Sequence, residues 1–499
     1  MRVIVTPLKL NLAILLLLPV LVPVFVRSIA SDASITADPL SGTEWQGVLH
    51  HGNDSKAIGM RFDIDRNGAT ILFLDIPEMK FRNLGPIHVH KDGDTYIAAD
   101  LKFNFTPNRK ILIGVEAYDG NSLEFQLTPG ALPPAPPQVP ATIPMVQPVW
   151  TFKTGGAIWS SPVTSGRLIY VGSTDGNVYA LDAKSGALVW RFGTKGPVMG
   201  RPTVDGRYIY TLSDDGLLYK LGKEDGQSVW QFDTHGGSVA RNLPSTQSDT
   251  YDYLASAATV SGGVVYIGSA DKRLYAIDAS TGHEKWHFET QGIVRTTPAV
   301  ARGLVFFGSY DHNVYAVKAE TGELVWKLDT LREVVSAPVV ADDTVYVGSR
   351  NSNLYALAAD TGVAKWKYFY WSSWVESSAL IRDDSLYIGS SDYQQLFAIN
   401  RINGKEIWRF NTDGSAWGTP AVTDKKVYIG AVGVVGYFID HHGGFYAVDR
   451  ATGRAVWRYL MSAMPGEFTY GFASSPTVDQ GRVFVGGLDG KLYAFREGD

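Results

Sequence analysis

The sequence predicts an all-β protein in which an eight-bladed β-propeller follows a small antiparallel β-barrel or meander domain. Two observations predict this fold. Tryptophan recurs about every 40 residues through most of the chain, and nearly every copy follows a glycine by four positions. A proline-rich stretch separates this periodic region from a shorter region with strand-like alternation. A repeat of about 40 residues with four short strands is typical of a propeller blade.

The periodic region spans residues 149–499. Its tryptophans are Trp150, Trp190, Trp230, Trp286, Trp326, Trp366, Trp408 and Trp457. The glycines four residues before the last seven of them are Gly186, Gly226, Gly282, Gly322, Gly362, Gly404 and Gly453. Glycine at this position suits a tight turn at positive φ before the outer strand. We expect each tryptophan to pack its outer strand onto the neighbouring blade.

The number of blades follows from counting the repeats. The first blade is expected to have strands at 161–164, 168–172, 178–182 and 187–192. Seven tryptophans end complete blades, but the last repeat stops after three strands, at Leu492–Phe495. The early strand Val149–Phe152 can supply the missing fourth strand. Seven complete blades and one shared blade give eight, and the ring closes without an open edge.

The strand and turn before several of the tryptophans follow the pattern Ala-x-Asp-x-x-Thr-Gly-x-x-x-Trp. It is complete in Ala276–Trp286 and Ala447–Trp457, and Ala356–Trp366 lacks only the aspartate. This region resembles the pyrroloquinoline-quinone (PQQ) repeat family. That family includes quinone-dependent alcohol dehydrogenases and the outer-membrane-assembly lipoprotein BamB. The resemblance implies an eight-bladed propeller and leaves the function open.

The first 30 residues are interpreted as a signal peptide or membrane anchor. Arg2 and Lys9 precede an apolar run from Leu10 to Val26, and Ser28-Ile29-Ala30 offers a cleavage site between small residues. Either reading predicts an exported protein in the periplasm or at the cell surface, held at the membrane if the segment is not cleaved. Residues 129–148 contain eight prolines and are expected to form a semi-rigid extended linker.

Residues 38–128 are expected to form the small antiparallel β-domain. Strand-like runs occur at 58–64, 69–76, 96–101, 111–117 and 123–127, with turn clusters such as Asp65-Arg66-Asn67-Gly68 between them. The opening Gly42–Leu49 resembles small β-domains that precede catalytic domains in some secreted bacterial hydrolases. No hydrolase motif follows it in this chain.

Composition excludes several functions. The chain has no cysteine, so disulfides, cysteine nucleophiles and a lipid anchor on cysteine are excluded. Its net charge of −5 offers no basic face for a nucleic acid. Histidines occur close together at 50–51, at 88 and 90, and at 441–442. His88 and His90 alternate on an expected strand and so share a face, but the adjacent histidines of the two doublets point in opposite directions. We predict no metal site from these groups.

Four segments depart from the regular repeat, at 231–254, 367–375, 431–444 and 458–471. Three join successive blades and one joins the second and third strands of a blade, so all four are expected on one face. Such a face is typical of a binding surface. Its candidate partner-binding aromatics are Tyr251, Tyr253, Tyr370, Trp371, Trp374, Tyr437, Phe438, Phe468 and Tyr470. Alternatively, these side chains pack on each other to order the loops.

Candidate ligand residues follow from aligning the blades on Ser160-Ser161-Pro162. The residue before this triplet is large or charged in four blades: Trp159, Arg295, Glu376 and Trp417. Such side chains near one axis can hold a small polar aromatic ligand by stacking and charge. The alternative is a structural Arg–Glu pair beside core tryptophans.

These observations favour a monomeric, non-catalytic binding or scaffold propeller that recognises a protein or glycan partner through the face with the four insertions. This hypothesis has no catalytic residue and needs no cofactor. A second hypothesis is a dehydrogenase that uses PQQ and Ca²⁺, with Glu376 as a cation ligand, Arg295 as a contact to the quinone, and Trp159 or Trp417 beneath the quinone. A third is a sensor that binds a small ligand at the channel mouth.

Overall fold

The computed structural model describes residues 40–499, except 53, 80, 100, 107–110, 119–120, 131–141, 245–250, 372 and 437–440. The described residues form two compact units, which divide between residues 140 and 141. The described regular elements are strands, apart from two short 3-10 turns, η1 (Pro77–Met79) and η2 (Gly236–Ser238). No helix among these residues has the length and apolar character needed to cross a membrane. The predicted signal or anchor at 1–30 lies outside the described residues.

The first unit is one antiparallel sheet in the order β4-β3-β2-β1-β9-β8-β7-β6-β5. Its strands are β1 (Glu44–His51), β2 (Asp54–Ile64), β3 (Thr70–Ile76), β4 (Phe81–His88), β5 (His90–Asp92), β6 (Thr95–Ala98), β7 (Leu101–Phe105), β8 (Leu112–Tyr118) and β9 (Asn121–Pro129). The two edge strands β4 and β5 are joined through the single residue Val89. The sheet must therefore curl until its edges meet, which gives the nearly closed barrel that the sequence predicts.

Aromatic side chains fill this barrel. Phe62, Phe103 and Phe125 are buried, and the Tyr96 ring stacks on Phe103 with 5.6 Å between centroids. They alternate with exposed residues along β7 and β9, as strand geometry requires. The run 96–101, predicted as one strand, is divided between β6 and β7. Ala99 has a φ of 54° there, so the chain turns where the apolar pattern continues.

The second unit contains eight sheets of the propeller type, each with its first strand innermost. Blade 1 consists of β11 (Val163–Ser165), β12 (Leu168–Gly172), β13 (Asn177–Asp182) and β14 (Leu188–Gly193), and blade 2 of β15 (Thr203–Asp205), β16 (Tyr208–Leu212), β17 (Leu217–Gly222) and β18 (Ser228–Asp233). Blade 3 consists of β19 (Thr259–Ser261), β20 (Val264–Gly268), β21 (Arg273–Asp278) and β22 (Glu284–Glu289), and blade 4 of β23 (Ala299–Ala301), β24 (Leu304–Gly308), β25 (Asn313–Lys318) and β26 (Leu324–Asp329).

The remaining blades continue the same order. Blade 5 consists of β27 (Val339–Ala341), β28 (Thr344–Gly348), β29 (Asn353–Ala358) and β30 (Ala364–Phe369), and blade 6 of β31 (Leu380–Arg382), β32 (Ser385–Gly389), β33 (Gln395–Asn400) and β34 (Glu406–Asn411). Blade 7 consists of β35 (Ala421–Val422), β36 (Lys426–Val434), β37 (Gly444–Asp449) and β38 (Ala455–Leu460), and blade 8 of β40 (Thr477–Asp479), β41 (Arg482–Gly486), β42 (Lys491–Arg496) and β10 (Trp150–Lys153). A further strand, β39 (Thr469–Gly471), pairs with β36.

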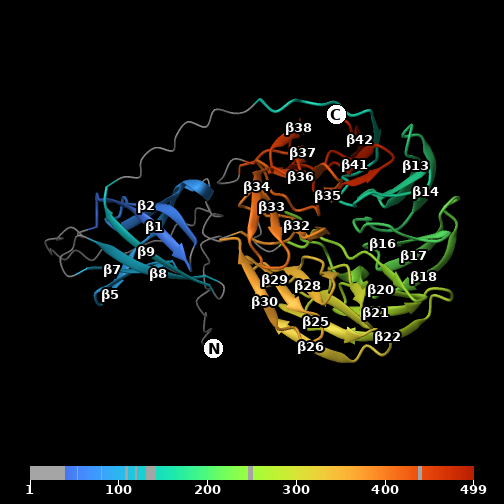
Figure 1. The fold of residues 1–499 in the computed structure, drawn as a ribbon, viewed down its shortest axis with the longest axis horizontal. Coiled ribbons are helices and arrows are strands. Elements are labelled where there is room, and N and C mark those ends of the chain that lie inside the picture. The colour runs from blue at the N-terminus through green and yellow to red at the C-terminus, as the bar shows by residue number, and fades with distance from the viewer. Residues whose placement is uncertain are drawn as a thin grey trace, which may run out of the picture. The chain divides into compact units, whose positions relative to one another are not determined.

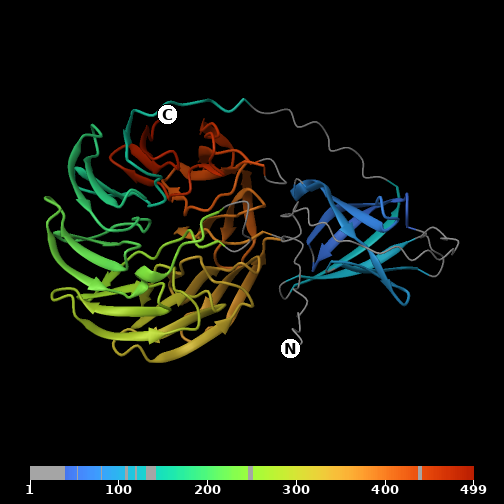
Figure 2. The same cartoon turned by 180° about the vertical axis from the view of Figure 1, so that it is seen from behind.

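The ring closes through the shared blade, as predicted. Strand β10 pairs antiparallel with β42, so that Trp150 lies opposite Ala494. The labelled strands of the eight sheets follow one another around a ring in Figure 1, and Figure 2 shows the same ring from behind. The innermost strands contact each other around the axis, for example β11 with both β15 and β40. This arrangement places the segment before each innermost strand around the mouth of a central channel.

The end of the predicted linker is not free in the structure. The Val146 amide donates to Arg458 O at 3.1 Å, and the Arg458 amide donates to Pro144 O at 2.9 Å. Met145 thereby forms a parallel bridge to the outer edge of β38. An outer strand presents unpaired backbone groups, and an extended proline-rich segment is suited to pair with them. The chain therefore covers the edge of blade 7 before it enters blade 8.

Seven of the eight repeat tryptophans pack against the turn glycine of the next blade. Gly322 has a φ of 76°, and a Cβ atom built on it would lie 2.6 Å from Cε3 of Trp286 in the preceding blade. The Trp286 Nε1–H donates to Ala319 O, three residues before that glycine, at 3.2 Å. The same hydrogen bond forms from Trp190, Trp230, Trp326, Trp366 and Trp408. Glycine is thus required both by the turn and by the ring that rests on it.

We predict that Gly322→Ala destabilises the propeller more than Gly303→Ala does. Both glycines have φ near 75°, but nothing lies within 4 Å of a Cβ atom at Gly303. Alanine at Gly303 should cost about 1–2 kcal/mol of unfolding free energy from backbone strain. At Gly322 the displaced Trp286 ring should add about 1–3 kcal/mol. Urea unfolding followed by tryptophan fluorescence measures both variants, and equal losses would contradict the packing of Trp286 on Gly322.

Candidate functional site at the channel mouth

Eight side chains surround the channel mouth, one from the segment before each innermost strand. We call them the mouth ring: Trp159, Met199, Ala255, Arg295, Val335, Glu376, Trp417 and Ala473. Closure of the propeller brings them to one end of the axis although they are spread over 300 residues of sequence. Arg295, Glu376 and Trp417 are buried there, and Trp159 is half-buried.

A loop of the chain itself fills the centre of this ring. The segment between β18 and β19 turns over the mouth and places Tyr253 among the predicted ligand residues. The Tyr253 ring lies 4.5 Å from Trp417 and 5.5 Å from Trp159, centroid to centroid. The two tryptophans are themselves 6.4 Å apart with nearly parallel planes. The structure thus brings Trp159 and Trp417 together, and a tyrosine of the same chain stacks against them.

Glu376 is fully engaged within the protein. The Tyr253 hydroxyl donates to its Oε2 at 2.7 Å, and Arg350 Nε donates to its Oε1 at 2.9 Å. Glu376 and Arg350 are each 2% exposed. The predicted alternative of an Arg–Glu pair therefore holds for Glu376, but its partner is Arg350 rather than Arg295. Arg350 comes from the turn between β28 and β29, which the sequence analysis did not consider.

Arg295 has a different partner from the same loop. Its Nε donates to Oδ1 of Asp252 at 2.8 Å, and a terminal nitrogen lies 2.5 Å from Oδ2. Asp252 also lies 3.5 Å from Arg241, which pairs with Asp214 at 2.6 Å. Together with Arg350 and Glu376, three guanidinium groups face three carboxylates. The buried charges at the mouth therefore balance without any bound ligand.

Burial also fixes the proton on Tyr253. Removal from water raises the pKa of its phenol well above the usual value, and the neighbouring Glu376 carboxylate raises it further. The hydroxyl consequently stays protonated and remains a donor to Glu376. The Tyr310 hydroxyl, whose pKa burial also raises, donates to Tyr251 O at 3.2 Å. Hydrogen bonds at both tyrosines of the segment thus hold the loop across the mouth.

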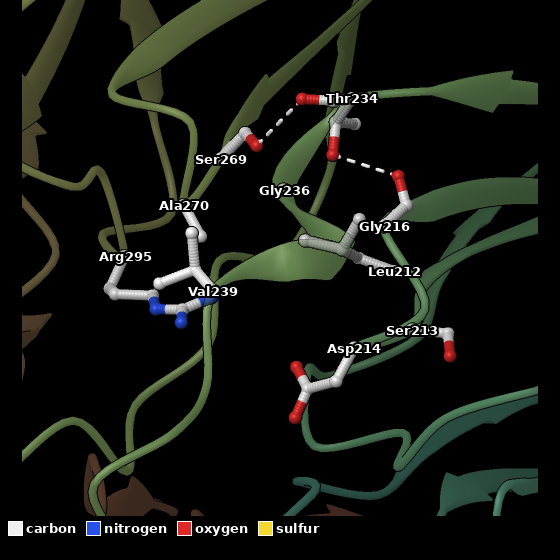
Figure 3. Close-up of a pocket in the computed structure, with 10 residues that line it drawn as sticks. All are labelled: Leu212, Ser213, Asp214, Gly216, Thr234, Gly236, Val239, Ser269, Ala270 and Arg295. Carbon is white, nitrogen blue, oxygen red and sulfur yellow. Dashed lines mark hydrogen bonds between the residues drawn. The ribbon is translucent and has the colours of Figure 1, made fainter.

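A small hollow remains beside this loop, as Figure 3 shows. Arg295 and Asp214 reach it from different blades, and Val239 of the loop lies between them in the view. Other lining residues include Thr234 and Ser269, whose side chain donates to Thr234 O at 3.1 Å. The hollow has room for about one water molecule. It is too small for an aromatic ligand.

The predicted partner-binding aromatics differ in their exposure. The buried ones are Tyr253, Tyr370, Trp371 and Tyr470. The half-buried ones are Tyr251, Trp374 and Phe468, and Trp374 lies 4.6 Å beneath the Arg350 guanidinium. Tyr437 and Phe438 lie outside the described residues. Most of the described rings therefore order the loops in this conformation, which was the alternative interpretation of them.

Other apolar side chains are exposed on these loops. Val239, Leu243, Val435 and Leu460 are between 36% and 45% exposed. The Val435 amide donates to Phe468 O at 2.9 Å, and β36 pairs with β39, so two of the four insertions form one continuous structure. Tyr251 O accepts a hydrogen bond from Arg350, whose guanidinium lies over the Trp374 ring, and this contact links the other two insertions. The insertions thus support each other in two pairs, and three of the four carry partly exposed apolar side chains.

The histidine groups do not form a cation site among the described residues. His88 and His90 are exposed at the barrel rim, and His441 is buried with its Nε2 3.2 Å from Ser415 Oγ. Across the described part of the chain, no three His, Cys, Asp or Glu side chains are grouped as metal ligands require.

Comparisons with known proteins identify the family to which the propeller belongs. Residues 147–257, 290–378 and 371–499 match the sequence profile of the family described as outer membrane protein assembly factor BamB. The chain belongs to this family. The match covers most of the propeller and confirms the resemblance to PQQ repeats. The barrel unit lies outside the matched residues.

Individual relatives are distant. The lupanine 17-hydroxylase [cytochrome c] of Pseudomonas sp is 32% identical over 103 residues, which are 20% of this chain and 14% of that enzyme. The crystal structure of BamB from Moraxella catarrhalis is 18% identical, with a TM-score of 0.52 over 70% of this chain and 99% of that one. The quinohemoprotein alcohol dehydrogenase of Comamonas testosteroni is 14% identical, with a TM-score of 0.56 over 70% and 76%. These structures share the fold.

The mouth residues, as arranged here, do not fit a quinone and Ca²⁺. A quinone needs a free aromatic surface, but Tyr253 covers Trp417 and Trp159. A Ca²⁺ ion needs several carboxylate or carbonyl oxygens, but both oxygens of Glu376 already accept hydrogen bonds inside the protein. A ligand of this kind would have to displace the Tyr251–Tyr253 segment.

We predict that Glu376→Gln lowers the unfolding free energy by about 3–5 kcal/mol, because it leaves the Arg350 charge buried without its carboxylate. Glu323→Gln is the matched control. Glu323 pairs with Lys318 at 2.7 Å, but its side chain is 64% exposed, so its loss should change stability by no more than about 0.5 kcal/mol. Equal denaturation midpoints for the two variants would rule out a stabilising network at the mouth.

Proposed function

We propose that this protein is an exported binding or scaffold propeller that recognises a protein or glycan partner through the face bearing loops 231–254, 367–375, 431–444 and 458–471. The proposal includes a monomeric propeller in the periplasm or at the cell surface, associated with the membrane if the N-terminal segment is retained. The family description, an outer-membrane assembly factor, is consistent with a binding role.

The observation that carries the proposal is the occupied mouth. Tyr253 fills the position beside Trp159 and Trp417 where a cofactor would stack, and the charges around it are paired internally. When the mouth is filled in this way, a partner can reach the loops of this face but not the mouth residues. Exposed apolar side chains on ordered loops are characteristic of protein-recognition surfaces.

The second candidate is a PQQ- and Ca²⁺-dependent dehydrogenase. Its support is the shared fold with quinohemoprotein alcohol dehydrogenase and the proximity of Trp159, Trp417 and Glu376. In this candidate the Tyr251–Tyr253 segment would leave the mouth, and Glu376 would exchange Arg350 and Tyr253 for the cation.

We predict site-specific cross-linking of a partner from the loop face. The chain has no cysteine, so a single introduced cysteine carries a photoactivatable cross-linker at one position only. Val435→Cys and Leu243→Cys place it on the loop face, and both wild-type side chains are partly exposed. We expect discrete adducts with an envelope protein or a polysaccharide when these variants are exported and irradiated in cells. Glycosidase and protease digestion distinguishes the two partner classes.

Val363→Cys and Ile402→Cys are the matched controls. These apolar residues are 65% and 61% exposed on turns between third and fourth strands, which lie on the opposite face. They should give no adduct. Adducts of equal yield from both faces, or none from the loop face of a folded and exported protein, would contradict the proposed surface.

The dehydrogenase candidate has its own assay. Purified protein is mixed with PQQ and Ca²⁺ and tested for dye reduction with alcohols and sugars. We expect no reduction and no retention of PQQ on gel filtration. Turnover that is present in the wild type and absent in folded Glu376→Ala would establish the dehydrogenase instead.

A further inference from the structure

Below the mouth, a second set of eight side chains encircles the axis. These residues stand two positions after each mouth-ring residue, and we call them the channel ring: Ser161, Arg201, Ala257, Thr297, Ala337, Ser378, Thr419 and Ser475. Hydrogen bonds between blades define the ring. The Ser475 amide donates to Ser161 Oγ at 2.9 Å, and the Ala257 amide donates to Thr297 Oγ1 at 3.0 Å.

These side chains face the channel. In each blade the residues on either side of the ring position are buried in the sheet, as Ser160 and Pro162 are beside Ser161. The ring residues themselves keep accessible surface in every blade except at Ala257. Since successive residues of an extended chain point in opposite directions, the accessible ones point toward the axis.

The hydroxyl groups of this ring have protons to donate. The oxygens of Ser161, Thr297, Ser378 and Ser475 each accept a backbone amide of the neighbouring blade. A hydroxyl that accepts in this way still has one O–H. No described group accepts that proton from any of the four, so the hydroxyls can donate into the channel.

Arg201 supplies the positive charge of the ring. It is the only ionisable residue among the eight, and no described residue forms an ion pair or hydrogen bond with its side chain. The Arg201 side chain is exposed, yet the protein atoms around it partly desolvate the guanidinium and lower its pKa. Both properties are expected of a side chain in a central channel. The carboxylates nearest the mouth, Asp252 and Glu376, are already paired with other arginines.

We propose that the channel ring binds a small anion, a tetrahedral oxyanion or a carboxylate, through the Arg201 guanidinium and the ring hydroxyls. The Arg201 guanidinium is exposed, but the protein atoms around it weaken its hydration, so an anion that enters the channel gains a favourable charge contact. Guanidinium binds sulfate, phosphate and carboxylate oxygens in a two-pronged geometry, and hydroxyl donors add to this. No carboxylate of the ring opposes the ligand. This site is separate from the partner face and does not depend on it.

The test measures anion-dependent stability of the full chain. Thermal unfolding is followed in sodium sulfate, phosphate or acetate, each compared with sodium chloride at equal ionic strength. A ligand that binds only the folded state raises the transition temperature in a saturable way. If the site prefers tetrahedral oxyanions, we expect sulfate and phosphate to raise the transition temperature of the wild type by several degrees more than chloride does. If it prefers carboxylates, we expect acetate to give this increase. Isothermal titration calorimetry with the same anion gives the affinity.

Arg201→Ser is the decisive variant, because serine occupies the equivalent position in blades 1, 6 and 8. It should lose the anion-specific increase, and without anions it should unfold at a temperature at least equal to that of the wild type. Arg167→Ser, at a side chain that is 63% exposed, should keep the wild-type response. General salting effects of sulfate act on all variants alike and cancel in this comparison.

Two results would overturn the anion site. One is an equal anion response in Arg201→Ser and the wild type, and the other is a wild type that responds to none of the three anions. If Arg201→Ser fails to fold, the anion affinity of Arg201→Lys is measured in its place. It keeps the charge but loses the two-pronged geometry, so its affinity should fall about tenfold. Cross-linking from Val435→Cys should be unchanged in both Arg201 variants, which separates this proposal from the partner face.

Discussion

The packing of seven of the eight repeat tryptophans on a glycine of the next blade is the contact on which the propeller depends. A blade is a four-stranded sheet that cannot bury both faces alone, so its stability comes from its neighbours. The indole ring supplies apolar area across the boundary, and its N–H satisfies a carbonyl in the adjoining turn. The position of the glycine, rather than the strands themselves, sets how closely one blade approaches the next. Regular spacing of this contact then fixes the curvature of the ring.

Because the blades are held at their outer strands, the inner strands need only surround the axis, and the residues at either level of the channel can vary. The mouth ring and the channel ring differ in how their charged side chains are paired. At the mouth, six charged side chains compensate one another beneath an aromatic stack that belongs to the chain. One level down, the ring consists of small side chains and one arginine, for which no counter-charge is found among the described residues. A buried charge network stabilises a structure only when every member has a partner.

The periodic part of the architecture was predictable because one contact repeats. The Trp–Gly spacing gave the blade number, and the tryptophan without a preceding repeat, Trp150, identified the shared blade. The mouth was predictable only in part. Alignment of the repeats brought Trp159, Glu376 and Trp417 to one place, but not the loop that covers them. A long loop without periodicity gives no signal for where its residues lie in the fold. The position of Tyr253 at the mouth and the pairing of Arg350 with Glu376 could therefore not be predicted from the sequence.

The shared blade has a consequence for how the molecule is made. Its outer strand is synthesised before any other strand of the propeller, and the three strands that complete it are synthesised last. Until β40, β41 and β42 have been synthesised, β10 is a strand with no sheet to join, and blade 7 is followed by an incomplete blade. The topology therefore delays closure of the ring until these three strands are made. A partly synthesised chain exposes unpaired strand edges that match each other, and these can pair between molecules as well as within one.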